Sequence, residues 1–148
     1  MQGQVDQETE RVGGAGDKDV TVPRVVVEDR GRCEMRTVEK PWGYEEIWAE
    51  TEKYVGKVLS INDGQKLSRQ YHEVKDETIR VQHGILTLEL GEPDTNSFKI
   101  IKMPVGASYR IMPGTIHRFC AKNGRVILLE ASTGELHDVV RLEDDYDR

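Results

Sequence analysis

Four side chains that can bind a metal ion lie in two short stretches of the sequence. Gln70, His72 and Glu77 occupy the stretch QYHEVKDE, and His117 follows further along in MPGTIH. Two imidazoles and one carboxylate make a mixed nitrogen and oxygen site that suits Zn²⁺, Fe²⁺, Mn²⁺, Co²⁺ or Ni²⁺. The amide oxygen of Gln70 donates less charge than a third imidazole would, so the metal stays a stronger Lewis acid. We predict a divalent metal ion bound by these four residues, with zinc as the expected ion.

A strand and a hairpin are needed to bring these side chains together. Side chains alternate across a strand, so positions 66, 68, 70 and 72 share one face of a predicted strand at Lys66–His72. Glu77 opens the next predicted strand after a short turn, and a hairpin folds it back beside His72. Gly114 permits a tight turn before His117. Strands that are distant in sequence become neighbours in a barrel, so His117 can complete the set.

The part of the sequence that holds these residues consists of short segments of alternating apolar residues, separated by turn signals. No long helical period occurs among them. Strands this short and this closely spaced indicate an all-β sandwich or barrel. The strands that we predict are Tyr54–Ile61, Lys66–His72, Thr78–Gln82, Ile85–Leu90, Ser97–Met103, Ser108–Met112, Ile116–Ala121 and Arg125–Ser132.

Length and composition limit the classes of protein that the sequence can encode. The 148 residues suit one domain with one core. The net charge of −6 argues against nucleic acid as a partner. No apolar run approaches the roughly 20 residues that span a bilayer, so we expect no membrane partner. The N-terminus lacks the pattern of a secretory signal, and two cysteines do not make a disulfide framework. We predict a cytoplasmic protein.

The first 34 residues differ from the rest in composition. They contain the glycine-rich run Gly13–Gly16, many charges and a single apolar run, Val25–Val27. We predict a flexible N-terminal tail over residues 1–34 and one folded domain over residues 35–148. An alternative is that the valine run adds an edge strand to a partner subunit.

The spacing of the candidate ligands resembles that of a known superfamily. The pattern Gly64-x5-Gln70-x-His72-x4-Glu77-x6-Gly84 resembles the first motif of the cupins, in which histidine usually stands at the position of Gln70. The second cupin motif is similar to Gly106-x7-Gly114-x2-His117. This resemblance implies a cupin-type double-stranded β-helix, also called a jelly-roll barrel.

A closer resemblance covers nearly the whole predicted domain. The blocks EKPWGYE, LSRQYH, PGTIH and DVVRLEDDYDR, at residues 39–45, 67–72, 113–117 and 138–148, resemble the cupin domain of type II mannose-6-phosphate isomerases. Glutamine commonly stands at the position of Gln70 in that family. The chain departs from the family at Val74 and Thr78, where histidines are frequent, and at Arg110, where an aromatic residue is frequent. The resemblance places these three positions around the pocket.

The resemblance implies an aldose–ketose isomerase that uses a metal-stabilised enediolate. Such an enzyme moves a proton between C1 and C2 of an open-chain sugar, which requires a base. Lys66 shares the inward face of its predicted strand and can serve as that base if burial lowers its pKa, or can bind the anion. Glu77 is another candidate. Arginine forks suit a sugar phosphate, and we expect this contact from Arg141, with Arg110 as a second possibility.

Two other functions are compatible with the same residues. One is a different metal-dependent cupin enzyme, such as an oxygenase or another sugar isomerase or epimerase. The other is a non-catalytic cupin that binds a sugar. For the first function the expected partner is a small sugar phosphate, and family resemblance leads us to expect a homodimer.

Overall fold

The chain divides into two compact units, residues 1–32 and residues 33–148. A computed structural model describes residues 9–10, 22–23, 31–91 and 97–148. The boundary between the units lies two residues before the one predicted from composition. No helix in the described ranges has the length and hydropathy that a membrane span requires.

The first unit contains one short β-ladder within the residues that the structure describes. Strand β1 (Thr9–Glu10) pairs antiparallel with β2 (Val22–Pro23). The predicted strand at Val25–Val27 lies outside the described residues, as does most of the predicted tail.

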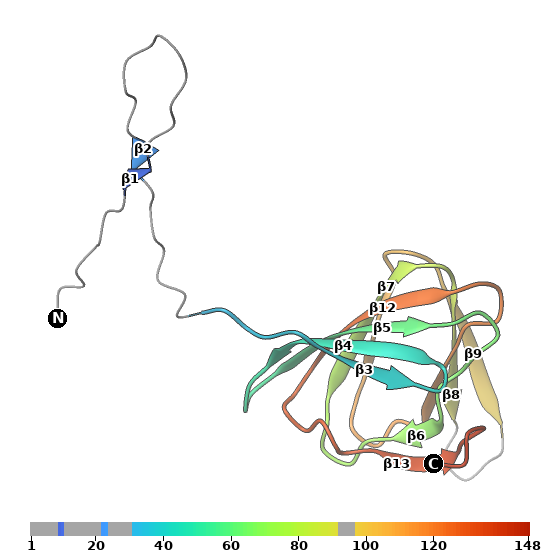
Figure 1. Cartoon of the computed structure of the whole chain (residues 1–148). Coiled ribbons are helices and arrows are strands. Elements are labelled where there is room, and N and C mark those ends of the chain that lie inside the picture. Colours follow the sequence, from blue (N-terminus) through green and yellow to red (C-terminus); the bar gives the residue numbers. More distant parts are fainter. Residues whose placement is uncertain (1–8, 11–21, 24–30, 92–96) are drawn as a thin grey trace. The chain divides into compact units, whose positions relative to one another are not determined.

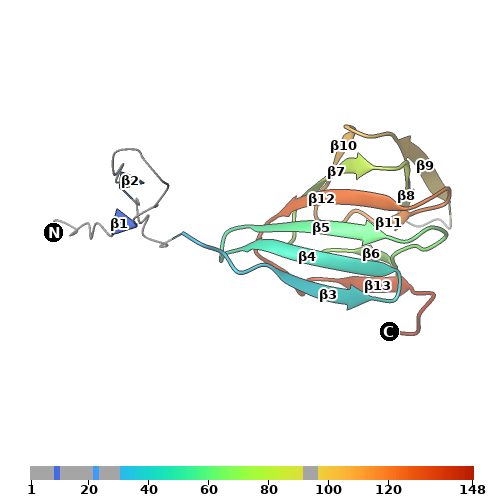
Figure 2. The ribbon, with the colours of Figure 1, turned by 45° about the horizontal axis from the view of Figure 1, so that its top comes forward.

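The second unit is built from two antiparallel β-sheets (Figures 1 and 2). The strands of the six-stranded sheet are, in order, β10 (Ser108–Ile111), β7 (Glu77–His83), β12 (Val126–Ser132), β5 (Val55–Ile61), β4 (Gly43–Glu50) and β3 (Arg36–Lys40). The five-stranded sheet runs β13 (Val140–Glu143), β6 (Arg69–Tyr71), β11 (His117–Cys120), β8 (Leu86–Gly91) and β9 (Phe98–Met103). The predicted all-β architecture is confirmed.

Alternation along the strands builds the core and also aims the polar residues of the site inward. On β7, Ile79 and Val81 are fully buried, whereas Thr78 and Arg80 are exposed. Glu77 has the same parity as the two buried residues and is itself buried. The strand that packs the core therefore carries Glu77 to the inner face.

Each strand predicted from alternation is present, with small differences in its ends. The largest difference is at Lys66–His72, where β6 covers only Arg69–Tyr71. Strands β1 and β2, in the predicted tail, were not expected. In the second unit, strands β3, β4 and β13 were missed. Charged residues interrupt their alternation, and in β4 the inward-facing Glu45 is buried, so no apolar face is visible in the sequence.

Candidate metal centre

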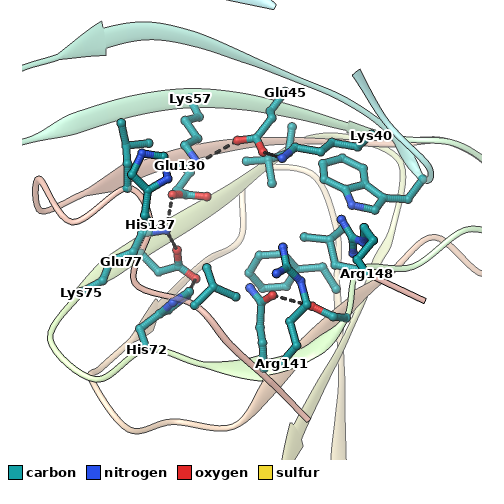
Figure 3. A pocket seen from close by; sticks show the side chains of 18 residues that line it. Lys40, Glu45, Lys57, His72, Lys75, Glu77, Glu130, His137, Arg141 and Arg148 are labelled. Carbon is teal, nitrogen blue, oxygen red and sulfur yellow. Dashed lines mark hydrogen bonds and ion pairs between the residues drawn. The ribbon is translucent and has the colours of Figure 1, made fainter. Parts of the chain in front are cut away.

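A cavity of about 230 Å³ lies in the second unit, and charged side chains dominate its walls (Figure 3). Strands of both sheets and the segment near the C-terminus contribute to it. Its lining includes the acidic residues Glu45, Glu77 and Glu130 and the basic residues Lys40, Lys57, Lys75, Arg141 and Arg148. Such a cavity suits a small, polar, charged molecule.

Three of the predicted ligands converge in one cluster. Glu77 Oε1 lies 3.5 Å from His72 Nε2 and 3.3 Å from His117 Nε2. These three atoms are buried and have no hydrogen-bond partner. Among the described residues, this is the group of histidine, cysteine and carboxylate side chains whose ligand atoms come close enough to share an ion, all within 4.8 Å of one another. We call these three residues the triad.

The other nitrogen of each imidazole fixes the orientation of the ring. His72 Nδ1 donates to the carbonyl of Asp138, and His117 Nδ1 donates to the carbonyl of Thr115 at 2.9 Å. A carbonyl can only accept, so Nδ1 carries a hydrogen, and in the neutral imidazole Nε2 then presents its lone pair to the centre of the triad. Three electron pairs that face one another without a donor repel, and a cation between them removes that repulsion. The donor set therefore fits a divalent metal ion.

A tight turn just before His117 is hydrogen-bonded to the stretch that contains His72. Gly114 has a φ of +80°, which a residue with a Cβ rarely adopts. Its N–H donates to the carbonyl of His72 at 2.7 Å. In the adjoining strands, His117 stands opposite Gln70 in the register of β11 and β6. The turn and the register together place His117 beside His72.

The turn between His72 and Glu77 is held by a single carboxylate. Asp138 accepts hydrogen bonds from the backbone N–H groups of Glu73, Val74 and Lys75 at 2.7–3.0 Å. These bonds lower the pKa of Asp138 below its ordinary value. Asp138 thus orders the turn through its side chain and orients His72 through its carbonyl.

The ammonium of Lys75 joins two buried carboxylates, and we call Lys75, Glu77 and Glu130 the carboxylate-rich cluster. Lys75 Nζ lies 2.7 Å from Glu77 Oε2 and 2.8 Å from Glu130 Oε1. Burial alone would lower the pKa of Lys75, but the two carboxylates raise it above its ordinary range. Burial and the charge of Glu77 raise the pKa of Glu130, although Lys75 opposes them. Lys75 therefore remains a cation.

A second cluster in the cavity has two lysines and one glutamate, and we call Lys40, Glu45 and Lys57 the lysine-rich cluster. Glu45 lies 2.7 Å from Lys57 and 2.9 Å from Lys40, each through a separate oxygen. Burial would raise the pKa of Glu45, but the two ammonium groups lower it below its ordinary value. The three residues come from β3, β4 and β5, and all line the cavity.

Gln70, the fourth predicted ligand, lines the same cavity. Its side-chain oxygen Oε1 accepts a hydrogen bond of 2.7 Å from the hydroxyl of Ser68. Ser68, Gln70 and His72 share one face as alternation predicts, since all three line the cavity. A role for Gln70 at a metal ion stays a prediction.

The structure separates the two residues predicted for catalysis. Arg141 lines the cavity. Lys66 is not part of the lining, and its ammonium pairs with Asp145 at 3.1 Å. The expected shared face fails at this position because β6 begins only at Arg69, so regular alternation does not extend back to Lys66. This placement removes the reason for which Lys66 was chosen as the base.

The positions at which the chain departs from the family pattern also lie outside the cavity lining. Val74 is 62% exposed, and Thr78 lies on the outer face of β7. Arg110 pairs with Asp76 on the exterior through hydrogen bonds of 2.6 Å and 3.1 Å. The expectation that these residues surround the pocket is corrected: none of the three contributes to its wall.

Six charged residues of the cavity were missed by the sequence analysis: Lys40, Glu45, Lys57, Lys75, Glu130 and Arg148. Lys75 lies in a turn, where periodicity gives no direction for a side chain. Arg148 lies at the end of the chain and pairs with Asp144 through both oxygens of that carboxylate. Glu130 had a usable signal, since alternate residues of β12 are buried and Glu130 is a charged residue on that apolar face.

Solved structures similar to this one share its fold. Capsular polysaccharide assembling protein CapF from Staphylococcus aureus matches with a TM-score of 0.66 and 13% identity, over 74% of this chain and 34% of CapF. KdgF from Halomonas sp. matches with a TM-score of 0.59 and 17% identity, over 74% and 93% of the two chains. The chain thus spans about a third of the length of CapF.

A third similar structure has a description that states its architecture. A Klebsiella pneumoniae protein with a double-stranded β-helix domain matches with a TM-score of 0.57 and 17% identity, over 80% of this chain and 91% of that one. The second unit is a double-stranded β-helix of the cupin class. The family model described as mannose-6-phosphate isomerase, C-terminal, matches residues 28–144, and the chain belongs to that family. No curated protein sequence matches significantly.

Proposed function

We propose that this protein is a metal-dependent aldose–ketose isomerase that acts on a phosphorylated sugar, with mannose 6-phosphate as the expected substrate. The observation that carries the proposal is the convergence of His72, Glu77 and His117, of which His72 and Glu77 line a cavity that also contains two arginines. Membership of the mannose-6-phosphate isomerase C-terminal family supports it. The cytoplasmic location and the homodimer stay predictions.

The triad would hold the metal ion. A divalent ion bound there would act as a Lewis acid and lower the cost of negative charge on two adjacent sugar oxygens. The chain itself prepares the site: the carbonyls of Asp138 and Thr115 hold each neutral imidazole in the tautomer whose Nε2 can bind a metal. Lys75 holds the second oxygen of Glu77, so Oε1 remains directed at the imidazoles.

The basic side chains of the cavity would bind the phosphate. Arg141 can present a planar fork of N–H donors, a geometry that matches phosphate oxygens, whereas the fork of Arg148 is already paired with both oxygens of Asp144. Both line the cavity, together with Lys40 and Lys57. Counting the five basic and three acidic side chains of the lining, the wall carries a positive excess before any metal is added. That excess favours an anionic sugar over a neutral one.

A second function, an iron-dependent oxygenase, is favoured by one specific observation. Two histidines and one carboxylate with further positions open form the ligand set of many non-haem Fe²⁺ oxygenases. The triad has this composition. Oxygen consumption by the Fe²⁺-loaded protein in the presence of a sugar phosphate would support the oxygenase. Isomerisation with redox-inactive Zn²⁺ would exclude a requirement for oxygen chemistry.

The deciding experiment supplies the purified protein with each divalent metal in turn and with mannose 6-phosphate. We expect fructose 6-phosphate to form. Arg141→Met should raise KM about 10–100-fold, the loss of roughly one charge-assisted hydrogen bond. Arg80→Met, on the exposed outer face of β7, is the matched control and should leave KM unchanged. Absence of turnover with every metal would overturn the assignment.

A further inference from the structure

We propose that Glu130 is the acid–base residue that carries the proton between C1 and C2 of the sugar, an inference that rests on the proposed isomerase function. Glu130 lines the cavity, is 4% exposed, and lies next to the triad through Lys75. In Figure 3 its carboxylate points into the cavity.

The contacts of Glu130 leave one oxygen available. Oε1 is bound to Lys75 at 2.8 Å, and among the described residues Oε2 has no hydrogen bond or ion pair. Lys75 contacts Glu77 at the same time, so the carboxylate of Glu130 is held at a fixed place relative to the triad. A base must lie within hydrogen-bond reach of the carbon-bound proton. Because Lys75 fixes the carboxylate of Glu130, that carboxylate can meet this condition for a sugar bound at the triad.

The other candidate bases of the cavity are engaged in contacts or exposed to solvent. Glu77 directs one oxygen to the imidazoles and the other to Lys75. Glu45 has both of its oxygens in ion pairs with lysines. Lys75 is an ammonium held by two carboxylates and has no free electron pair. His137 is exposed, whereas Glu130 is buried beside the triad.

The proton transfer can be written with every atom and electron accounted for. The Glu130 carboxylate takes the proton from C2, the electrons of the broken C2–H bond form a C1=C2 double bond, and the C1=O1 electrons settle on O1. In the return step the carboxylic acid gives its proton to C1, the double-bond electrons form the C1–H bond, and O2 becomes the ketone. The hydroxyl proton of O2 passes to O1. C2 is oxidised and C1 reduced by the same electron pair, so no other reactant is needed.

The electrostatic surroundings are consistent with this role. Burial and the charge of Glu77 raise the pKa of Glu130, which brings its two protonation states closer together in free energy near neutral pH. The placement of Glu130 by Lys75 carries the inference, and the pKa supports it.

The test is Glu130→Gln, which keeps the shape and an oxygen for Lys75 but cannot carry a proton. We expect kcat for mannose 6-phosphate to fall about 10²–10⁴-fold. Exchange of the C1 hydrogen of fructose 6-phosphate with deuterated water, followed by NMR, should fall by a similar factor. Metal content and the Kd for fructose 6-phosphate, measured by calorimetry, should stay within about threefold of the unchanged protein. Glu89→Gln, in the pair with Lys122, is the control and should change none of these.

The outcomes separate the inference from the function on which it rests. If the unchanged protein isomerises the sugar and Glu130→Gln retains kcat within tenfold, the inference is wrong and the isomerase function stands. If Glu130→Gln loses the metal, Glu130 supports the triad instead, and the inference is again wrong. If the unchanged protein turns over no sugar phosphate, both fall together. Slow turnover and slow exchange with intact metal and sugar binding would establish the role.

Discussion

The carboxylate-rich cluster and the lysine-rich cluster share one cavity and are built from the same two residue types in opposite ratio. Glu77 and Glu130 share Lys75, whereas Lys40 and Lys57 share Glu45. The first cluster carries a net negative charge and the second a net positive charge. The cavity is therefore polarised, with a negative group beside the triad and a positive group on another part of its wall (Figure 3).

This difference shows how one cavity can attract two ligands of opposite charge. The negative cluster favours a divalent cation, since it contains a triad ligand and a further carboxylate nearby. The positive cluster favours an anionic group, such as the phosphate of the proposed substrate. The difference in composition between the clusters also explains why the pKa values of two buried glutamates shift in opposite directions. The pKa of Glu45 is lowered by two lysines, and that of Glu130 is raised by burial and by Glu77.

The largest effect is expected from removal of a triad imidazole. His117→Ala takes away one of the three converging atoms, so we expect metal affinity to fall by at least about 100-fold. Isomerase activity should be lost with the metal. The measurement is metal content after gel filtration, together with calorimetric titration of the metal-free protein.

Another histidine of the same domain provides the control for this substitution. His83 lies on β7 and is exposed. His83→Ala should leave metal affinity unchanged. If His117→Ala kept the metal, or if both variants lost it equally, the triad would not be the metal site.

The second prediction compares the lysines of the two clusters. Lys75→Met leaves two buried carboxylates without their shared counter-ion, and we expect a loss of about 3–5 kcal/mol in the free energy of unfolding. Lys57→Met leaves Glu45 paired with Lys40, so the expected loss is smaller, about 1.5–3 kcal/mol. Both are measured by urea denaturation with a chelator present. An equal loss in the two variants would mean that the ratio of charges in the clusters does not matter for stability.

Much of the fold could be predicted because alternation is a local property of the sequence. The two cupin motifs also predicted the triad. Alternation along the strands directs His72 and Glu77 to the inner face, and the turn at Gly114 positions His117. Strands β3 and β4 escaped prediction because an inward position in each holds a charged residue of the lysine-rich cluster, Lys40 in β3 and Glu45 in β4. An apolar pattern cannot reveal a strand whose buried face is polar.

The remaining errors concern residues whose direction depends on distant contacts. Lys66 lies just before a strand that is shorter than expected, and its side chain turns to Asp145 in the C-terminal segment. Lys75 lies in a turn that Asp138 holds, and Asp138 is far away in sequence. Contacts between the C-terminal segment and the rest of the domain determine where the side chains of Lys66 and Lys75 point. Neighbouring residues in the sequence carry no signal for such contacts.

The smallest effect is a difference in pH dependence between the two glutamates. The folded-state pKa of Glu45 lies below its ordinary value of 4.5, so its contribution to stability is present above pH 4.5 and is lost as the pH falls through the folded pKa. The folded-state pKa of Glu130 lies above 4.5, so its contribution is present below pH 4.5 and is lost as the pH rises through the folded pKa. The two carboxyl groups thus oppose each other.

Two glutamine substitutions test these opposite signs in the metal-free protein. Glu45→Gln should flatten the fall in unfolding free energy below pH 4.5, because that carboxyl no longer takes up a proton there. Glu130→Gln should instead flatten the decline above pH 4.5, because the amide needs no proton to remain neutral when buried. Urea denaturation across the acid range, with a chelator present, gives both slopes. Slopes that change in the same direction would show that the two clusters do not differ in electrostatic balance, and the polarity inferred for the cavity would have to be abandoned.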